Sequence, residues 1–430
     1  MNKPETSTLP RRNVITASAL ATASLGFARS AVVGSDTIKI GLVGCGGRGS
    51  GATINTLIAD KGTKLYAVAD VFEEKAKAAP SRIGANPVAK DRVDVSPERV
   101  FHGLDAYKQL LETDVDVVIL ATPPGFRPLH IEAAINAGKH VFAEKPVAVD
   151  GPGIRRVLEA CKKAKQKNLA VVSGLCWRYE ENTLKLVNKI HDGLLGDIVA
   201  VECQRFNTGV WVRPRLDGQS ELAHQLQNWY YYTWLSGDFN VEQFVHEIDR
   251  CAWLRKDELP VRCWGCGGRE TRNGSDHGHI FDHMAVTFEY ANGQRLHCNA
   301  AQQKGFAGRN EVVAYGTKGQ VNLGRFITEM YDGRMERHEN KRAVQMHQQE
   351  QNVMYAALRK GEIINNGTYM AHSTLMGLMM RDACYTGKVI EWDKALNSKH
   401  VYAPADIDTM TMDTVVQPPE VAIPGVTILG

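Results

Sequence analysis

The sequence predicts an α/β protein of two domains: an N-terminal doubly wound parallel sheet, followed by a C-terminal α+β domain with a largely antiparallel, open-faced sheet. Three observations predict this. A glycine-rich turn joins a strand to a helix near residue 44, strands and helices alternate up to about residue 176, and strand-like segments separated by turns dominate afterwards. At 430 residues the chain is also too long for one ordinary core.

We expect four segments along the chain. They are an export-signal segment 1–36, a dinucleotide-binding domain 37–176, a substrate and oligomerisation domain 177–400, and an extended C-terminal arm 401–430. The arm contains four prolines and little periodicity, and it would pack on its own domain or on a neighbouring subunit. We expect a homo-oligomer.

Composition excludes several classes of protein. Hydrophobic residues make up 43% and charged residues 23%, as in soluble globular proteins. The formal charge of +3 leaves no basic surplus for nucleic acid. No apolar run approaches the ~18 residues of a membrane span. Cys263 and Cys266 form a Cys-x-x-Cys motif on a predicted strand, where residues three apart face opposite sides, so we expect neither a redox pair nor a metal site there.

The N-terminal segment has the pattern of a twin-arginine export signal. Arg11 and Arg12 precede a mildly apolar stretch, residues 16–27, and small residues at Ala28 and Ser30 offer a cleavage site. The pattern predicts recognition by the twin-arginine machinery and a periplasmic location. Because that pathway carries folded proteins, a cofactor would be bound before export. A disordered tail with a chance arginine pair is the alternative.

A glycine-rich turn lies between the first strand, residues 37–43, and the first helix, residues 50–60. The first glycine permits the tight turn, the second lets the backbone approach a pyrophosphate, and the third lets the helix pack on the strand. The N–H groups and positive end of the helix would face the phosphates, and Arg48 would add a direct contact. The turn therefore predicts a Rossmann-type dinucleotide site. Its expected cofactor contacts are Gly44, Cys45, Gly46, Gly47, Arg48 and Gly49.

The nicotinamide cofactor is predicted from the end of the second strand. Residues 64–69 are β-prone and end at Asp70, at the distance from the glycine turn where an acid binds the adenosine ribose hydroxyls. Because a carboxylate there would repel a 2′-phosphate, NAD is favoured over NADP. The alternative is an aspartate that only caps the next helix.

Strands and helices continue to alternate after this point. The predicted strands are nearly all apolar, as in a parallel sheet covered on both faces. They lie at residues 115–121, 140–143 and 169–173, and the helices between them at about 128–137 and 153–166. This repetition predicts a doubly wound sheet.

Several motifs in this region resemble the glucose-fructose oxidoreductase/inositol dehydrogenase (Gfo/Idh/MocA) family. They are Ala-Thr-Pro-Pro at 121–124, His130, Ala-Gly-Lys-His-Val at 137–141 and Glu-Lys-Pro at 144–146. The resemblance is dense over residues 37–180 and sparser up to about 400. It implies further cofactor contacts, namely Thr122, Pro123, His130 and Glu144.

The resemblance places Lys145 at the reacting carbon, beside the nicotinamide. There an ammonium would stabilise a developing alkoxide and take part in proton transfer. In the family the peptide bond before Pro146 is often cis. Trp177 and Arg178 follow the last strand of the first domain. The resemblance implies that residues at this position contact cofactor and substrate, and we expect both to bind substrate.

The second half contains one unusual helix, expected at residues 241–254. Its apolar stripe faces the core, while Gln243, Glu247 and Arg250 would lie opposite in solvent. A third row, at spacings of four and three, holds Glu242, His246 and Asp249.

The family pattern at this helix is Asp-x-Gly-x-His-x-x-Asp. His246 matches its histidine, which the resemblance makes the general base, and a pKa near neutrality suits that task. Asp249 matches its final acid and is expected to bind substrate, together with Lys145 and His246. Glu242 replaces the usual Asp and would tune His246, and Phe244 replaces the usual Gly, so both reshape the pocket.

The remaining second half predicts an antiparallel sheet. A helix at 182–192 precedes strand-like segments at 198–205, 261–265, 284–289, 295–300, 311–315 and 320–323. The aromatic run 228–234 would be core or subunit interface, or would stack on sugars. His277, His279 and His283 lack a fourth ligand beyond Asp282, so no metal is expected.

Together these features predict hydride transfer between a tightly bound NAD and a carbon of a sugar, inositol or related polyol, with Lys145 and His246 handling the proton. Outside the cytoplasm no soluble NAD pool exists, so a redox-neutral glycosidase or lyase, in which NAD oxidises the sugar transiently, is the first alternative. A non-catalytic sugar or dinucleotide sensor is the second.

Overall fold

The computed structural model describes residues 36–341, 344–404, 407–417 and 420–429. The predicted export signal, apart from Asp36, lies outside the described residues. Within those ranges no helix combines the length and apolar character needed to cross a membrane.

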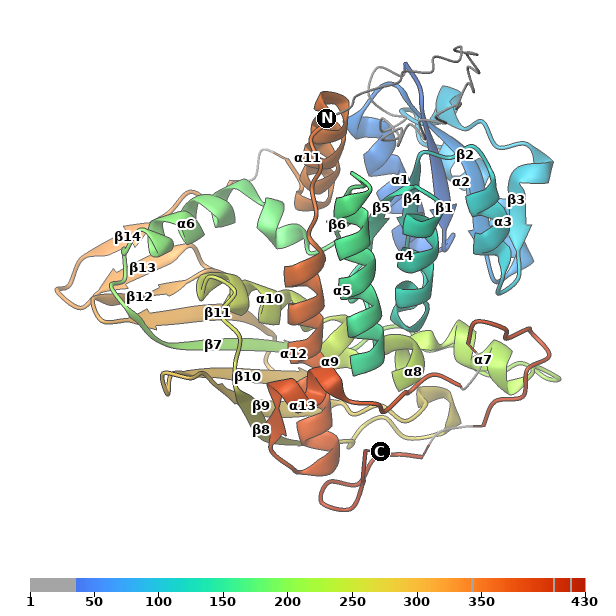
Figure 1. The fold of residues 1–430 in the computed structure, drawn as a ribbon. Helices are drawn as coiled ribbons and strands as arrows, with labels where there is room; N and C mark the ends of the chain where they lie inside the picture. Colours follow the sequence, from blue (N-terminus) through green and yellow to red (C-terminus); the bar gives the residue numbers. More distant parts are fainter. Residues whose placement is uncertain (1–35, 342–343, 405–406, 418–419, 430) are drawn as a thin grey trace, which may run out of the picture.

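The first domain is a six-stranded, fully parallel sheet with helices on both faces (Figure 1). Its strand order is β3-β2-β1-β4-β5-β6, so the order reverses between β1 and β4, which confirms the predicted doubly wound sheet. The strands are β1 (Ile38–Val43), β2 (Thr63–Asp70), β3 (Val100–His102), β4 (Val117–Leu120), β5 (His140–Ala143) and β6 (Val171–Ser173). The helices are α1 (Gly47–Ala59), α2 (Glu73–Gly84), α3 (Ala106–Glu112), α4 (Arg127–Asn136) and α5 (Gly151–Gln166).

Two hydrophobic cores lie on the two faces of this sheet. One contains side chains of α1, α2 and a later helix, α11 (Met346–Lys360). The other contains side chains of α3, α4 and α5 and continues into the second domain. The chain thus returns to the first domain after building the second, and α11 packs directly on α1, the helix that follows the glycine turn.

The third glycine of the turn has a packing role that can be tested. A Cβ at Gly49 would lie 2.0 Å from the carbonyl oxygen of Gly44, which is immovable backbone. Gly49→Ala is therefore expected to lower the free energy of unfolding by about 3 kcal/mol, the upper end for an overpacked core. Gly51→Ala, where a Cβ meets nothing within 4 Å, is the matched control and should be neutral or stabilising. Equal denaturation midpoints for the two variants would contradict this role.

The second domain is built on a nine-stranded mixed sheet of order β14-β13-β12-β11-β7-β10-β9-β8-β15. β7 and β10 are parallel and every other neighbouring pair is antiparallel, as predicted. The strands are β7 (Ile198–Asn207), β8 (Arg262–Gly268), β9 (His283–Glu289), β10 (Arg295–Gln302), β11 (Arg309–Gly316), β12 (Gly319–Asn322), β13 (Ile327–Met330), β14 (Met335–Arg337) and β15 (Ile390–Glu391). Six of them match predicted strands, whereas β13, β14 and β15 were not predicted.

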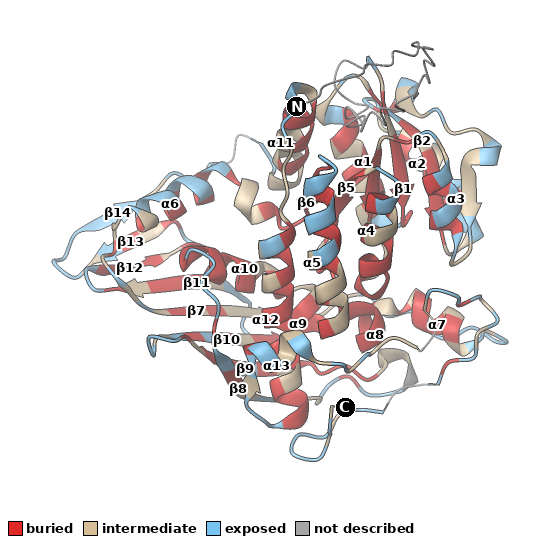
Figure 2. Ribbon diagram, in the orientation of Figure 1, coloured by how far each residue is buried: buried red, intermediate tan, exposed pale blue. Residues whose placement is uncertain are grey.

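Helices α10 (Val245–Leu254) and α12 (Gly367–Thr386) pack on this second sheet and cover one of its faces. The other helices of this part of the chain are α6 (Glu181–His191), α7 (Glu221–Gln227), α8 (Thr233–Ser236), α9 (Phe239–Glu242) and α13 (Trp392–Asn397). Short 3₁₀ turns include η3 (Pro124–Phe126) of the first domain, η4 (Cys176–Tyr179) and η5 (Trp229–Tyr231). Figure 2 shows α10 and α12 largely buried against the sheet. Burial alternates along β9 and β10, as expected for a sheet covered on one face only.

The helix predicted at 241–254 is broken. α9 ends at Glu242 and α10 begins at Val245, because the residues between them form a turn in which the His246 N–H donates weakly to the Gln243 carbonyl. Glu247 and Arg250, predicted to lie in solvent, are instead 0% and 1% exposed. The prediction was wrong because α10 is covered on both sides. Glu247 accepts from Arg205 of β7 at 3.0 Å, and Arg250 stacks on Trp177 at 4.4 Å.

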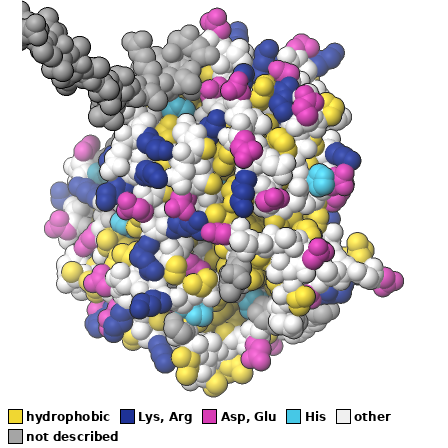
Figure 3. Space-filling view, turned by 45° about the vertical axis from the view of Figure 1, so that its right-hand side comes forward, with side chains coloured by type: hydrophobic (Ala, Val, Ile, Leu, Met, Phe, Trp, Pro, Cys, Tyr) yellow, Lys and Arg dark blue, Asp and Glu magenta, His cyan; other side chains and the backbone are white. Residues whose placement is uncertain are grey.

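The C-terminal arm, where it is described, lacks regular secondary structure and runs beneath both domains (Figure 1). Met410 and Val416 are buried in the main core, and the Gln417 carbonyl accepts from Gln225 of α7 at 3.3 Å. The described part of the arm thus packs on its own chain, one of the two expected arrangements. The face of the molecule drawn in Figure 3 carries basic and acidic side chains intermixed, without a large patch of one charge.

Candidate active site

A cleft lies at the carboxyl ends of β1, β2 and β4, where the strand order reverses. Gly44 has a φ of +95°, and a Cβ there would strike the backbone of Ala121. At Gly46 a Cβ would meet nothing within 4 Å, so the backbone is open to a close-approaching group. α1 begins here with no side-chain cap, which leaves its N–H groups facing the cleft. A dinucleotide pyrophosphate fits this turn.

Asp70 lies in the same cleft, at the end of β2. Its carboxylate accepts from the backbone N–H of Cys45 at 2.7 Å and of Phe72 at 3.0 Å, and it is 9% exposed. Burial raises the pKa of Asp70 above its ordinary value, although these hydrogen bonds and the charge of Lys75 oppose the rise. The side chain is therefore fixed by the glycine turn itself.

Thr122, Pro123 and His130 also line the cleft, as the resemblance implies. The Thr122 hydroxyl and His130 Nδ1 are hydrogen-bonded at 3.1 Å. Burial lowers the pKa of His130 to about 3, so its imidazole is neutral. A neutral, fixed ring suits a wall of a site for an anionic cofactor without adding a titrating charge.

Arg48 does not point freely toward the cleft. Its guanidinium donates to Glu144, and Nη2 donates to Glu350 of α11 at 3.0 Å. Burial alone would raise the pKa of Glu144, but the charges of Arg48, Arg127 and Lys145 outweigh it and lower the pKa. Arg48 and Glu144 thus form an ionised pair beside the cleft, and direct phosphate contact by Arg48 remains a prediction.

Lys145 follows β5 and meets the broken helix. Its ammonium donates to the Glu242 carboxylate at 2.8 Å and to the Glu242 backbone carbonyl at 2.5 Å. That carbonyl is available because the break at residues 243–244 removes the helical bond from the His246 N–H. The side chains of Lys145 and Glu242 are only 14% and 12% exposed. The Lys145–Pro146 peptide bond is cis, as the resemblance implies.

His246 lies beside this pair on the first turn of α10. Burial lowers the pKa of His246 well below its ordinary value, and the charge of Lys145 lowers it further, followed by those of Arg205 and two more distant groups. Its Nδ1 is buried and has no hydrogen-bond partner among the described residues. The imidazole is therefore neutral at neutral pH and free to accept a proton.

The other three predicted substrate contacts are engaged with the protein. Arg178 binds Asp249 through two nitrogens, at 2.8 and 3.0 Å, and also pairs with Asp257. Asp249 further accepts from Ser373 of α12 at 2.9 Å, so it ties α10 to α12. Trp177 stacks under Arg250. The structure brings Lys145, Glu242 and His246 together but holds this second group in packing contacts, and their binding of substrate remains a prediction.

The weaker predicted motifs are structural where the chain is described. Tyr230, Tyr231, Tyr232 and Trp234 are buried in the core, one of the alternatives kept open for the aromatic run. Cys263 is buried and Cys266 exposed, which places them on opposite faces as expected. Among the described residues, the histidines at 277–283 do not gather into a group with donor atoms close enough to hold a metal.

The comparisons with known proteins identify the family. The sequence model of the oxidoreductase family with an NAD-binding Rossmann fold matches residues 38–172, and that of the GFO/IDH/MocA C-terminal domain matches residues 183–322. The chain belongs to the Gfo/Idh/MocA oxidoreductase family.

Its relatives within this family include dehydrogenases of cyclic polyols. Inositol 2-dehydrogenase of Salmonella typhimurium strain LT2 is 27% identical over 276 residues, which is 63% of this chain and 73% of the relative. A glycosyl hydrolase family 109 protein of Streptomyces coelicolor is 29% identical over 163 residues, 38% of this chain and 32% of that protein. The crystal structure of scyllo-inositol dehydrogenase from Lactobacillus casei, with bound NAD(H) and scyllo-inositol, has the same fold, with a TM-score of 0.63 at 20% identity over 83% of this chain and 99% of that one.

Sequence reasoning missed several residues of this Gfo/Idh/MocA site. Leu226 comes from the second domain and lines the cofactor cleft. Trp229 lines it too; it belongs to the aromatic run 228–234, for which core packing, a subunit interface or sugar stacking was expected and not a place in the cofactor cleft. Arg127 is buried and donates to the carbonyls of Thr122 and Pro146, so it braces two of the motifs. The only available signal was the presence of aromatic and basic residues without an obvious role, because their partners are far away in the sequence.

Proposed function

We propose that the protein is an NAD-dependent oxidoreductase that transfers hydride between a tightly held nicotinamide cofactor and a CH–OH carbon of a sugar, inositol or related polyol. One observation carries the proposal: the ammonium of Lys145, held by Glu242, lies beside the neutral imidazole of His246 at the edge of the sheet that carries the glycine turn. The relatives named inositol 2-dehydrogenase support a polyol as the substrate class.

The residues present divide the reaction between them. When bound, the nicotinamide supplies the hydride acceptor. His246 accepts the proton of the substrate hydroxyl, and Lys145 stabilises the negative charge that develops on its oxygen. Glu242 holds the ammonium in place through both its carboxylate and its carbonyl. The oxidised carbon thus loses a hydride and its oxygen loses a proton, which yields the carbonyl product.

The expected preference for NAD over NADP rests on Asp70. Asp70→Asn is expected to weaken NAD binding and to reduce that preference. Loss of a charge-assisted hydrogen bond of roughly 1.5–3 kcal/mol would weaken NAD binding about tenfold or more. The amide would also tolerate a 2′-phosphate, so the preference for NAD over NADP would narrow. Asp114→Asn removes an exposed carboxylate that pairs with Lys39 outside the cleft, and it should not weaken NAD binding. Both nucleotides would be offered together and the bound ones counted after denaturation. A wild-type protein that retains mainly NADP would refute the preference.

A redox-neutral glycosidase or lyase is the second candidate. The resemblance to a glycosyl hydrolase family 109 protein favours it. The cofactor cleft is also lined by Leu226 and Trp229 of the second domain, and a cofactor held between two domains would exchange slowly. The discriminating experiment uses the purified protein with aryl glycosides and no added NAD. Release of aglycone without net NADH identifies the glycosidase. Accumulation of one equivalent of NADH and an oxidised sugar identifies the dehydrogenase.

We also propose export by the twin-arginine pathway and assembly into a homo-oligomer. The Arg11-Arg12 pair supports the first proposal, and the uncovered face of the nine-stranded sheet supports the second. Cell fractionation with an Arg11→Lys, Arg12→Lys variant tests export, because the variant should stay in the cytoplasm. Light scattering on the purified protein tests assembly, and a monomeric mass would refute it.

A further inference from the structure

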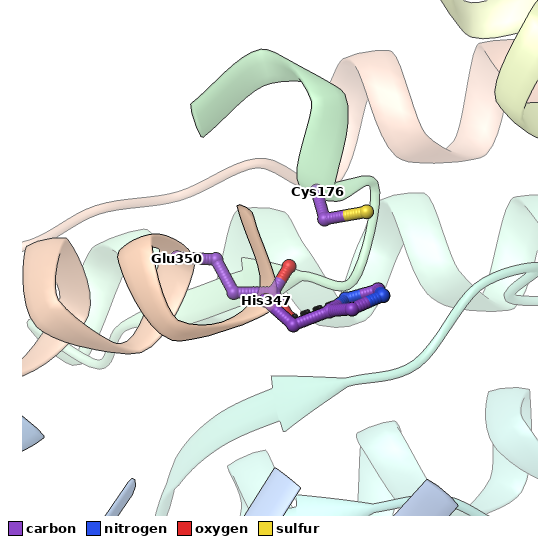
Figure 4. Close-up of side chains that lie close together, drawn as sticks. All are labelled: Cys176, His347 and Glu350. Atoms are coloured by element: carbon purple, nitrogen blue, oxygen red, sulfur yellow. Dashed lines mark ion pairs between the residues drawn. The ribbon is translucent and has the colours of Figure 1, made fainter. Parts of the chain in front are cut away.

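A cluster of three side chains borders the proposed active site without a part in the mechanism above. Cys176 begins η4, directly after the sixth strand, while His347 and Glu350 lie three residues apart in the first turn of α11. Figure 4 shows the thiol, the imidazole and the carboxylate gathered around one space. One donor atom from each lies within 4.8 Å of the others. The topology thus joins residues from two distant parts of the chain.

Two donor atoms in the cluster lack a hydrogen-bond partner. Glu350 is fully buried; its Oε1 accepts from Arg48, whereas its Oε2 is buried and has no partner. His347 Nδ1 lies 3.6 Å from Glu350 Oε1, within ion-pair distance if the imidazole is protonated (Figure 4) but too far for a hydrogen bond, and this buried nitrogen has no hydrogen-bond partner. Buried polar atoms are nearly always paired, so a group that accepts electron pairs is expected in this space.

The charges nearby favour a cation as that group. Arg48 is shared between two buried carboxylates, those of Glu144 and Glu350. Lys145 is taken up by its pair with Glu242. Glu350 is fully buried and shares its partner Arg48 with Glu144, so its charge is only partly balanced. A proton or a metal ion would stabilise this carboxylate.

The donor set selects a metal class. Thiolate, imidazole and carboxylate are the three ligand types that zinc combines, whereas calcium and magnesium prefer oxygen alone. Three protein ligands with one open position are typical of catalytic zinc sites. We propose that Cys176, His347 and Glu350 bind one divalent transition metal ion of the zinc class, with the fourth position left for water or a substrate oxygen. On binding, the Cys176 thiol releases its proton and becomes the thiolate ligand.

The test measures metal directly and does not depend on activity. The full chain would be stripped with a chelator, loaded with excess zinc, desalted and analysed for metal content. One equivalent of zinc is expected in the wild type, and Cys176→Ser should bind zinc at least about 100-fold more weakly, since even partners outside the first coordination shell cost 10–100-fold. Cys161→Ser is the matched control because Cys161 is also a buried free cysteine but lies on α5, outside the cluster.

Two further measurements keep the proposal falsifiable if Cys176→Ser misfolds. Zinc is expected to raise the melting temperature of the wild type. His347→Ala changes a side chain that is 39% exposed, and this variant should show no such rise. Cobalt loading should give a thiolate-to-cobalt absorption band in the wild type and in Cys161→Ser. Zinc retention that is absent, or equal in the wild type and His347→Ala, would overturn the proposal and leave a proton on Glu350 as the explanation of the cluster.

Discussion

Lys145→Ala is expected to lower kcat for polyol oxidation by about 1,000-fold. The variant loses the ammonium that stabilises the developing alkoxide, and contributions of this kind are typically 10²–10⁴-fold. It also leaves the Glu242 carboxylate without its cation, close to the reacting oxygen, which adds an unfavourable charge. Because the variant leaves the glycine turn and Asp70 unchanged, NAD content should stay close to that of the wild type.

Lys139 offers a matched control for this experiment. It lies immediately before β5, at the opposite end of the strand from Lys145, and donates to the Thr113 carbonyl at 3.0 Å. Lys139→Ala should therefore keep kcat within a few-fold of the wild type. If Lys145→Ala retained kcat within tenfold and still bound NAD and polyol, the assignment of Lys145 as a catalytic residue would fail.

The first domain could be predicted from sequence because its signals are local. A strand, a glycine turn and a helix follow one another between Ile38 and Ala59, and Gly44 and Gly49 both stand where a Cβ would strike the backbone. Asp70 could be predicted for the same reason, because it ends a strand that follows the glycine turn within one strand-helix unit. The six predicted strands of the second sheet were found for a similar reason, since β-prone segments bounded by turns are a local signal, and β9 and β10 also alternate in burial.

The parts that sequence could not reveal depend on contacts between distant segments. The spacing of Glu242, His246 and Asp249 predicted one polar row, yet Asp249 pairs with Arg178 while Glu242 pairs with Lys145. The sequence shows no local signal for the helix break that separates the two pairs, and the carbonyl that the break frees is bound by Lys145, 97 residues earlier in the chain.

The burial of Glu247 and the Cys176–His347–Glu350 cluster were hidden for the same physical reason. A charged residue opposite an apolar stripe normally lies in solvent, but Arg205 of β7 supplies Glu247 with a buried partner. The cluster joins the end of the first domain to a helix that returns to it much later in the chain. Tertiary contacts, and not local propensity, decide such positions.

His246→Gln is expected to lower kcat by about 100–1,000-fold and to change the pH profile. An amide cannot accept the substrate proton, and general-base contributions fall in this range. In the wild type, burial and the Lys145 charge lower the pKa of His246 well below 6.5, so the imidazole stays neutral as the pH falls to 6.5. Activity should therefore persist to that pH and fall only under more acidic conditions, as His246 becomes protonated.

The same depressed pKa links His246 to stability, and its sign can be worked out. Because the folded protein favours the neutral imidazole, the unfolded chain binds more protons below its pKa of about 6.5. This contribution to stability is complete above that pH and is lost as the pH falls toward the folded pKa. His246→Gln should thus lose both the acidic limb of kcat/KM and part of the acid sensitivity of unfolding. His297→Gln, on the exposed side of β10, should lose neither. If the fall of kcat/KM at acidic pH persisted unchanged in His246→Gln, a group other than His246 would be the one that accepts the substrate proton.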